Sequence, residues 1–327
     1  MKKIFSFLLC ATTAFSVCML TGCVGKKKEA LRFGLGVYTS VEATNAAEDQ
    51  NGNGQAVMTV AAVLLDQKNK IVRCVLDCAD YTLSYTASGK APANESFLTK
   101  REQGAAYGMK LYGGAVKEWY EQADAFCTLV QGKTVDEVKA LVASDGKGNG
   151  NVIRAGCTIS VSDFVKSIEK ASDQAVASSA TAKDTLKLGC ATIQTTEDAS
   201  ADSLGKNLIE TTFFAATADT NGIITDAHSD CAEIELTFDS AGASQTEGKW
   251  IVSTKRDCGN SYGMKQYGGA KKEWYEQADA FDRACIGKRA GDISSLLGID
   301  GYGTDVLQNA GCTIRVNGFV KAALKIK

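Results

Sequence analysis

The sequence of 327 residues contains a single histidine, and this shortage limits the chemistry that it supports. His228 has no counterpart in the internal repeat described below, so it cannot serve a site that occurs twice. The residues that the repeat shares include no nucleophile with a base and an orienting group, which argues against a hydrolase. The cysteines include no Cys-x-x-Cys pair, and no histidines cluster, so a zinc site is equally unsupported.

Basic residues are also too few and too scattered for a nucleic-acid-binding protein. The formal net charge is −2, and it becomes −4 if Lys2 and Lys3 are removed with the first 22 residues. A mildly acidic chain without a basic block is a poor partner for phosphate backbones. We therefore expect no nucleic acid among its partners.

The N-terminus has the features of a secretory signal, with Lys2 and Lys3 followed by an apolar run from Ile4 to Leu20. The run ends in Leu-Thr-Gly-Cys, which resembles the lipobox of bacterial lipoproteins. The resemblance implies a signal peptide over residues 1–22, a lipidated Cys23, a tether over 23–30 and a place on the outer face of the cell membrane. An uncleaved membrane anchor is the alternative, although no second apolar span follows.

One long segment occurs twice. Residues 107–126 read YGMKLYGGAVKEWYEQADAF and residues 262–281 read YGMKQYGGAKKEWYEQADAF, and the same offset relates AGCTI at 155–159 to AGCTI at 310–314. A period of this length corresponds to a whole domain, so the sequence predicts a tandem duplication. We expect a first domain over 31–171, a linker rich in Ala, Ser and Thr over 172–186, and a second domain over 187–327.

Local patterns predict the elements within each domain. Residues 57–65 and 71–78, and in the second copy 208–218 and 223–227, are β-rich and flank turn signals. The apolar spacing of Trp119, Ala123, Phe126 and Val130 predicts a helix. Thr134 and Glu137 form a capping box that opens another helix, and the second copy lacks it. Strands followed by helices predict an α+β fold, in which a Gly-x-Thr turn precedes a C-terminal helix capped by Ser162 or Asn317.

The cysteine positions offer two interpretations. Cys157 and Cys312 are repeat equivalents, and Cys78 and Cys231 nearly so. One hypothesis is a disulfide from Cys78 to Cys157 and another from Cys231 to Cys312, because proteins outside the cytoplasm can form disulfides. The alternative is that these cysteines are small buried apolar side chains.

The order of hairpin, helices, Gly-Cys-Thr turn and final helix resembles the FMN-binding domain family. This family occurs in subunits of sodium-pumping quinone reductases and in flavin-carrying bacterial lipoproteins. In it, a threonine of a motif like Asp-x-x-Ser-Gly-Ala-Thr accepts FMN through a phosphoester bond that a dedicated transferase makes. The resemblance implies that Thr158 and Thr313 are the acceptors.

The resemblance also implies the rest of the site. Gly156 and Gly311 would let the backbone approach the phosphate. Cys157 and Cys312 would complete the turn, and Trp119 and Trp274 are as readily explained as core residues. Four further side chains would pack on the flavin ring: Tyr107, Tyr262, Met109 and Met264.

The implied role is an electron carrier without substrate chemistry of its own. Its partners would be a membrane reductase or quinone system as donor and an external acceptor such as ferric iron. The motif departs from the family at Ala155, Cys157 and Val152, where Ser, Ala and Asp are usual, and at the equivalent Ala310, Cys312 and Leu307. Noncovalent binding of FMN therefore stays open. The alternative function is a surface lipoprotein of the same fold that serves as a binding or structural module without flavin.

Overall fold

The computed structural model describes residues 30–47, 50–245 and 248–326. Cys23, the predicted lipidation site, lies outside the described residues. The first half of the chain forms three long strands, β1 (Leu31–Thr44), β2 (Gly52–Leu65) and β3 (Ile71–Tyr85), joined as an antiparallel sheet in the order β3-β2-β1. The second half repeats this order with β5 (Thr185–Glu197), β6 (Gly205–Ala218) and β7 (Ile224–Phe238).

Helices follow the strands in both halves, which confirms the α+β class. The first half contains α1 (Lys100–Gln103), η1 (Gly104–Tyr107), α2 (Trp119–Val130), α3 (Val135–Lys139), α4 (Gly150–Ala155) and α5 (Ser162–Asp173). The second half contains α6 (Lys255–Cys258), η2 (Gly259–Tyr262), α7 (Trp274–Cys285), η3 (Ala290–Leu296), η4 (Ile299–Gly301), α8 (Asp305–Asn309) and α9 (Asn317–Ala323). Among the described residues, none of these helices has the length and apolar character needed to cross a membrane.

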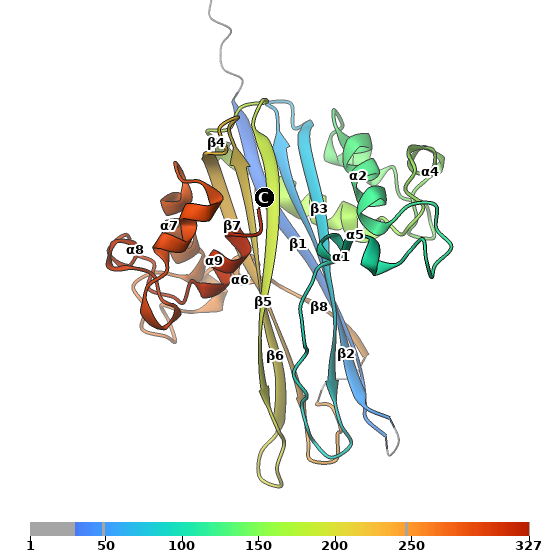
Figure 1. Ribbon diagram of the computed structural model, residues 1–327, viewed down its shortest axis with the longest axis vertical. Helices are drawn as coiled ribbons and strands as arrows, with labels where there is room; N and C mark the ends of the chain where they lie inside the picture. Colours follow the sequence, from blue (N-terminus) through green and yellow to red (C-terminus); the bar gives the residue numbers. More distant parts are fainter. Residues whose placement is uncertain (1–29, 48–49, 246–247, 327) are drawn as a thin grey trace, which may run out of the picture.

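The two sheets face each other, and the helices lie on their outer sides (Figure 1). Alternation along the strands builds this arrangement, since successive side chains of a strand point to opposite faces. On β2, for example, Met58 and Val60 belong to the core between the sheets, whereas Ala61 and Val63 pack against the helices of the first half. The central core contains side chains of both halves, and Tyr85 stacks on Phe238 with ring centroids 4.7 Å apart.

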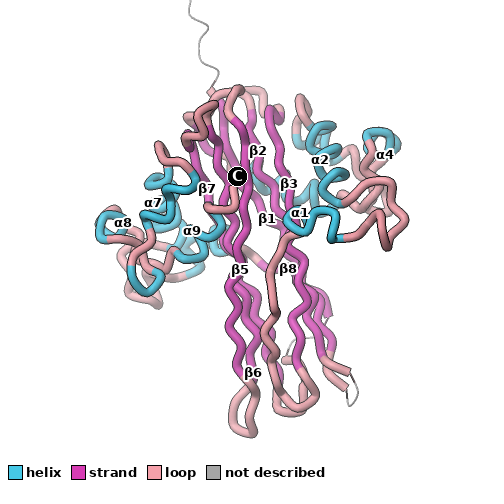
Figure 2. The backbone as a smooth tube through the Cα atoms, in the orientation of Figure 1, coloured by secondary structure: helices cyan, strands magenta, loops and turns pink. Residues whose placement is uncertain are grey.

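Each half also has its own outer core. Trp119, Phe126 and Phe164 cover one sheet, and Trp274, Phe281 and Phe319 cover the other. The helical groups stand on opposite flanks of the sandwich, while the strands extend beyond them as bare hairpins (Figure 2). The domain boundaries stay predictions, because the halves have separate outer cores but a common central one.

Each half also has a segment that contacts the sheet of the other half. Strand β8 (Gly248–Val252), from the second half, pairs antiparallel with Thr39–Ala43 of β1. In return, the chain after β3 runs along β5, where the N–H of Asn94 donates to the side-chain oxygen of Gln194 at 2.7 Å. The segment predicted to be a linker contains strand β4 (Val176–Ser178), which pairs with the start of β1.

The capping predictions had mixed outcomes. Thr134 and Glu137 form the predicted capping box of α3, and η3 in the second half has no side-chain cap. The predicted caps Ser162 and Asn317 are wrong, because α5 and α9 begin at these residues and follow Val161 and Val316. The Ser162 hydroxyl donates instead to the carbonyl of Gly146 at 3.1 Å, which ties the helix start to the preceding loop.

The predicted disulfides are also absent. The nine cysteines in the described part of the chain are unbonded, and eight of them are buried. Cys78 lies on β3, where its sulfur approaches the hydroxyl of Thr59 on the neighbouring strand at 3.8 Å. The alternative, that these cysteines serve as small core residues, describes Cys78, Cys157, Cys231 and Cys312 correctly.

Candidate functional site

A buried glutamine connects the predicted acceptor threonine to the duplicated helix. Gln122 lies one turn into α2 and is 1% exposed. Its side-chain oxygen accepts hydrogen bonds from the backbone N–H and the hydroxyl of Thr158, at 2.8 and 3.1 Å. Its side-chain nitrogen donates to the carbonyl of Lys117 at 3.1 Å and approaches the sulfur of Met109 at 3.9 Å. The glutamine therefore holds two of the predicted site residues, Thr158 and Met109, around one amide.

The second half contains the same network. The oxygen of Gln277 accepts from the N–H and hydroxyl of Thr313, both at 2.9 Å. Its nitrogen donates to the carbonyl of Lys272 at 3.1 Å and approaches the sulfur of Met264 at 3.7 Å. A buried amide is stable only when its donors and acceptors are paired, and this requirement fixes the Gly-Cys-Thr turn against the helix. Both threonines remain exposed to solvent.

The glycine before each cysteine adopts a conformation that other residues rarely reach. Gly156 has φ 95° and Gly311 has φ 98°, each at the end of a short helix. A Cβ at Gly156 would lie 2.2 Å from the ammonium of Lys117, and one at Gly311 would lie 2.0 Å from that of Lys272. The glycines thus make room for a lysine ammonium within the turn that leads to each threonine.

The cysteines in the two turns are structural. Cys157 and Cys312 have no solvent exposure. Desolvation raises the pKa of each thiol to about 11, so both are protonated at neutral pH. A neutral buried thiol is neither a nucleophile nor a metal ligand, and the two side chains fill the core beneath the turn.

A buried carboxylate orders the loop that carries the predicted methionine. Glu118 is 3% exposed and accepts the N–H groups of Met109 and Lys110, at 2.9 and 3.2 Å. It also takes part in a capping box at the start of α2. Glu273 does the same for Met264 and Lys265 in the second half, at 2.9 and 3.3 Å. The loop and the helix start are thereby fixed to each other.

The predicted ring-packing residues meet in a small cavity of the second half. This cavity of about 200 Å³ is lined by Tyr262, Met264, Trp274 and Ile314, the residue after Thr313. Lys255 lines it as well, paired with Glu210 and Glu233 at 2.8 and 2.9 Å, and its ammonium lies 5.4 Å from the centre of the Tyr262 ring. Trp274 is 4% exposed and packs on Phe319, so most of its surface belongs to the core.

The first half differs at the equivalent of this cavity. Tyr38 and Asp163 replace Ile193 and Gly318 of the second half. The ammonium of Lys166 lies over the Tyr38 ring, 4.1 Å from its centre. Tyr107 keeps its contact with a lysine, since the ammonium of Lys100 lies 5.1 Å from its ring centre. The hydrogen-bond networks of the two halves match, but their apolar surroundings do not.

Sequence reasoning missed the residues that organise each turn. Gln122, Lys117 and Glu118 all lie inside the duplicated segment, and so do Gln277, Lys272 and Glu273. The same segment contains Tyr112 and its equivalent Tyr267, which are 84% and 80% exposed. The sequence signal for these residues was that each is the same in both copies. A polar or exposed residue retained at both positions has no evident packing role, so its retention points to another one.

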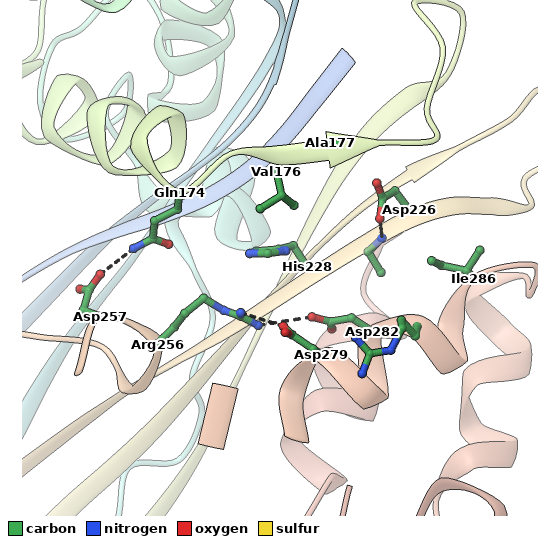
Figure 3. A pocket seen from close by; sticks show the side chains of 12 residues that line it. Gln174, Val176, Ala177, Asp226, His228, Arg256, Asp257, Asp279, Asp282 and Ile286 are labelled. Atoms are coloured by element: carbon green, nitrogen blue, oxygen red, sulfur yellow. Dashed lines mark hydrogen bonds and ion pairs between the residues drawn. The ribbon is translucent and has the colours of Figure 1, made fainter. Parts of the chain in front are cut away.

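A larger cavity lies at the junction of the two halves (Figure 3). It has a volume of about 620 Å³ and is bounded by the end of α5, strand β4, strand β7 and helices α6 and α7. His228 lies inside it, 9% exposed, between Val176 and the guanidinium of Arg256. Arg256 is paired with Asp279 at 2.8 Å and with Asp282 at 3.5 Å. The ion pair of Arg256 and Asp279 has an equivalent in Arg101 and Asp124 of the first half, also at 2.8 Å, but Cys127 stands there in place of Asp282.

Burial shifts two titrating groups of the junction cavity in opposite senses. Desolvation, assisted by the charge of Arg256, lowers the pKa of His228 to about 3. Desolvation raises the pKa of Asp282 to about 7, although Arg256 and the hydrogen bonds from Ser229 oppose the shift. At neutral pH the imidazole is therefore neutral, and the carboxyl titrates near neutrality.

We expect His228→Gln to reduce the sensitivity of the fold to acid. Below pH ~6.5 the unfolded chain binds a proton at His228 and the folded chain does not. The free energy of unfolding therefore falls with pH, and His228 accounts for a loss of about 2 kcal/mol between pH 7 and 5. Asp282 acts in the opposite sense, because its stabilising contribution to the folded state is present at low pH and is lost as pH rises toward 7. Urea unfolding of the original protein and the variant at pH 7 and pH 5 measures how much stability each loses on acidification. An equal loss in both proteins would contradict the lowered pKa of His228.

Two other kinds of site, a phosphate contact at two lysines and a metal site, find no support among the described residues. Lys110 and Lys265, which could have paired with a phosphate, are bound to Glu121 and Glu276 at 2.7 and 2.6 Å. Within the described ranges, no three His, Cys, Asp or Glu side chains are grouped as metal ligands.

Comparison with known proteins gives one partial match. A curated protein named chlorophenol reductase, from Desulfitobacterium hafniense, is 33% identical over 119 residues. The match covers 32% of this chain, and the chain spans 36% of that protein. No family model matches the sequence, and no solved structure matches this fold. The likeness is too short to place the chain in a family.

Proposed function

We propose that the protein is a membrane-anchored flavoprotein that carries electrons through FMN bound in each half, at Thr158 and Thr313. The observation that carries this proposal is the repeated network in which Gln122 or Gln277 holds an exposed threonine hydroxyl beside a methionine. Two copies of one buried amide network around two exposed hydroxyls are expected of a site used twice. The matching networks also support descent of the two halves from a tandem duplication.

The residues of each turn fit the phosphate of FMN. The exposed threonine offers a hydroxyl oxygen for a phosphoester, and the ammonium of Lys117 or Lys272 places a positive charge beside the glycine two residues earlier. Gly156 and Gly311 leave the space that this lysine occupies. A transferase could therefore reach the hydroxyl from solvent, while the lysine would stabilise the phosphate charge.

The apolar residues would contact the ring. FMN supplies the redox chemistry, so the protein need only hold it and tune its potential. Tyr262 and Met264 would do this in the second half, and Tyr107 and Met109 in the first. The cavity of about 200 Å³ is smaller than the ~300–1,000 Å³ typical of small-molecule sites, so it can enclose only part of such a cofactor. A ring left partly at the surface would suit exchange of electrons with partner proteins.

The location follows from the N-terminal sequence. Lipid on Cys23 would hold the chain at the outer face of the membrane, near a reductase or quinone system as donor. An external acceptor such as ferric iron would then receive the electrons. The partial likeness to a protein named chlorophenol reductase supports a redox role in general terms. The described residues offer no shared acid, base and nucleophile that would convert an organic substrate, which favours a carrier over an enzyme.

The visible spectrum and intact mass of the chain test the proposal. When the protein is produced together with an FMN transferase, we expect flavin absorbance and two covalent FMN adducts. Dithionite should reduce the flavin, and ferric iron should reoxidise it. Loosely bound flavin that is lost on denaturation would indicate noncovalent binding, and a colourless protein of unmodified mass would contradict the proposal.

The junction cavity favours a second candidate, a surface lipoprotein that binds a ligand without flavin. Its volume of about 620 Å³ falls within the range of small-molecule sites, and it holds a neutral imidazole beside charged side chains. Calorimetric or fluorescence binding by flavin-free protein, abolished by His228→Gln and unchanged by loss of both threonine hydroxyls, would favour this function over electron transfer.

A further inference from the structure

Two cysteines face each other between a strand and a helix of the first half. Cys74 lies on β3 and Cys127 lies in the last turn of α2. Their Sγ atoms are 3.7 Å apart, and the two residues are 7% and 6% exposed. The sulfurs are in van der Waals contact, and rotation of the two side chains toward each other would have to bring them to the ~2.0 Å of a disulfide bond.

The second half ties the same two elements together by other means. The positions of Cys74 and Cys127 are taken there by Ala227 and Asp282. The carboxylate of Asp282, on α7, accepts the N–H and the hydroxyl of Ser229, on β7, at 3.0 and 2.7 Å. A helix-to-strand connection therefore exists in the second half, and two thiols occupy its place in the first.

We infer that Cys74 and Cys127 form a disulfide in the mature protein. Each thiol gives up a proton, and the two electrons pass to an oxidant that is itself a disulfide, either of a small molecule or of an oxidoreductase, which leaves as two thiols. The products are one Sγ–Sγ bond in this chain and a reduced oxidant. The inference rests on the part of the proposed function that places the chain outside the cytoplasm.

The disulfide bond would affect the turn that contains Thr158 through helix α2. This helix carries Gln122, whose amide holds Thr158. A covalent link from β3 to the last turn of α2 would limit movement of the helix relative to the sheet, and so of the glutamine relative to the turn. Asp282 would supply the corresponding restraint for Gln277 through hydrogen bonds.

The folded structure slows the reaction once the helix has docked. The hydrogen bond with Cys127 and burial raise the pKa of the Cys74 thiol well above its ordinary value. Because only the thiolate attacks a disulfide, oxidation of the docked pair is slow. The bond would therefore form while α2 is still joining the sheet, and the folded reduced chain would resist oxidation.

Oxidative refolding of the full chain, without flavin, tests the inference. The denatured, reduced protein is refolded in a mixture of reduced and oxidised glutathione, blocked with iodoacetamide under denaturing conditions and digested with trypsin. We expect a cross-link between the peptides of residues 74–90 and 118–133. Adding reductant should lower the melting temperature of the oxidised protein by about 5 °C.

Cys74→Ala and Cys78→Ala form a matched pair of variants, because both cysteines are buried on β3 within the same core. Cys74→Ala should abolish the cross-link and the reductant-dependent shift, and Cys78→Ala should keep both. Full alkylation of Cys74 and Cys127 after oxidative refolding, or a link that survives Cys74→Ala, would overturn the inference. Since no flavin is present, a failure of the flavin proposal leaves this result unchanged.

Discussion

The chain with both Thr158→Ala and Thr313→Ala is expected to carry no covalent FMN, and each single variant one FMN instead of two. Alanine lacks the oxygen that a phosphoester needs. Each hydroxyl lies on an exposed residue and makes one hydrogen bond to a glutamine, so its loss should cost only about 1 kcal/mol and leave the chain folded. Intact mass and flavin absorbance of the four proteins, each produced with the transferase, measure the result.

Thr128→Ala is a suitable control for these variants. Thr128 is exposed on the same helix as Gln122, and its hydroxyl donates to the carbonyl of Asp124 at 2.9 Å. It belongs to neither turn, so this variant should keep both FMN groups. Unchanged flavin in the double threonine variant would show that other residues hold the cofactor, whereas loss of flavin from Thr128→Ala would point to a general effect on folding.

We expect Gly34→Ala to destabilise the protein by about 3 kcal/mol or more, the largest effect on stability among our predictions. Helix α5 packs directly on the backbone of β1 at this glycine. A Cβ there would lie 1.8 Å from the carbonyl oxygen of Ala171, so the helix would have to move. Overpacking of a core costs ~1–3 kcal/mol when side chains can adjust, and here the obstacle is backbone. Urea unfolding monitored by circular dichroism measures the change.

Gly291→Ala provides the comparison. Gly291 is exposed, lies in η3, and has no atom within 4 Å of the position that a Cβ would take. Its substitution should alter the free energy of unfolding by less than about 0.5 kcal/mol. If Gly34→Ala were as stable as Gly291→Ala, the close contact between β1 and α5 would not exist in solution.

The elements with strong local signals could be predicted from the sequence. The spacing of Trp119 and Phe126 identified α2, and Thr134 with Glu137 identified the start of α3. Strand β1 gave no comparable signal, because it is covered on both faces and its buried residues do not alternate with polar ones. The pairing of β8 with β1 was also unpredictable, since it joins residues about 200 positions apart that share no local pattern.

The candidate site was predictable only as far as the repeat revealed it. Duplication identified the turns of Thr158 and Thr313, but it could not show that Gln122 reaches Thr158 across 36 positions of sequence. The junction cavity could not be predicted, because it exists only where α5 and β4 of one half meet β7 and α7 of the other. His228 shows the difficulty, since a lone histidine without a repeat equivalent gives no sign of its neighbours.

The pairing of β8 with β1 and the common central core make the two candidate sites dependent on one another. Without the second half, β1 would lose β8, and the apolar face that contains Met58 and Val60 would be open to water. An isolated half would therefore tend to aggregate through a bare strand edge. Two fragments divided near residue 180 should recover a native fold only when mixed, by complementation. In the intact chain, one cooperative unfolding transition would remove both threonine turns together.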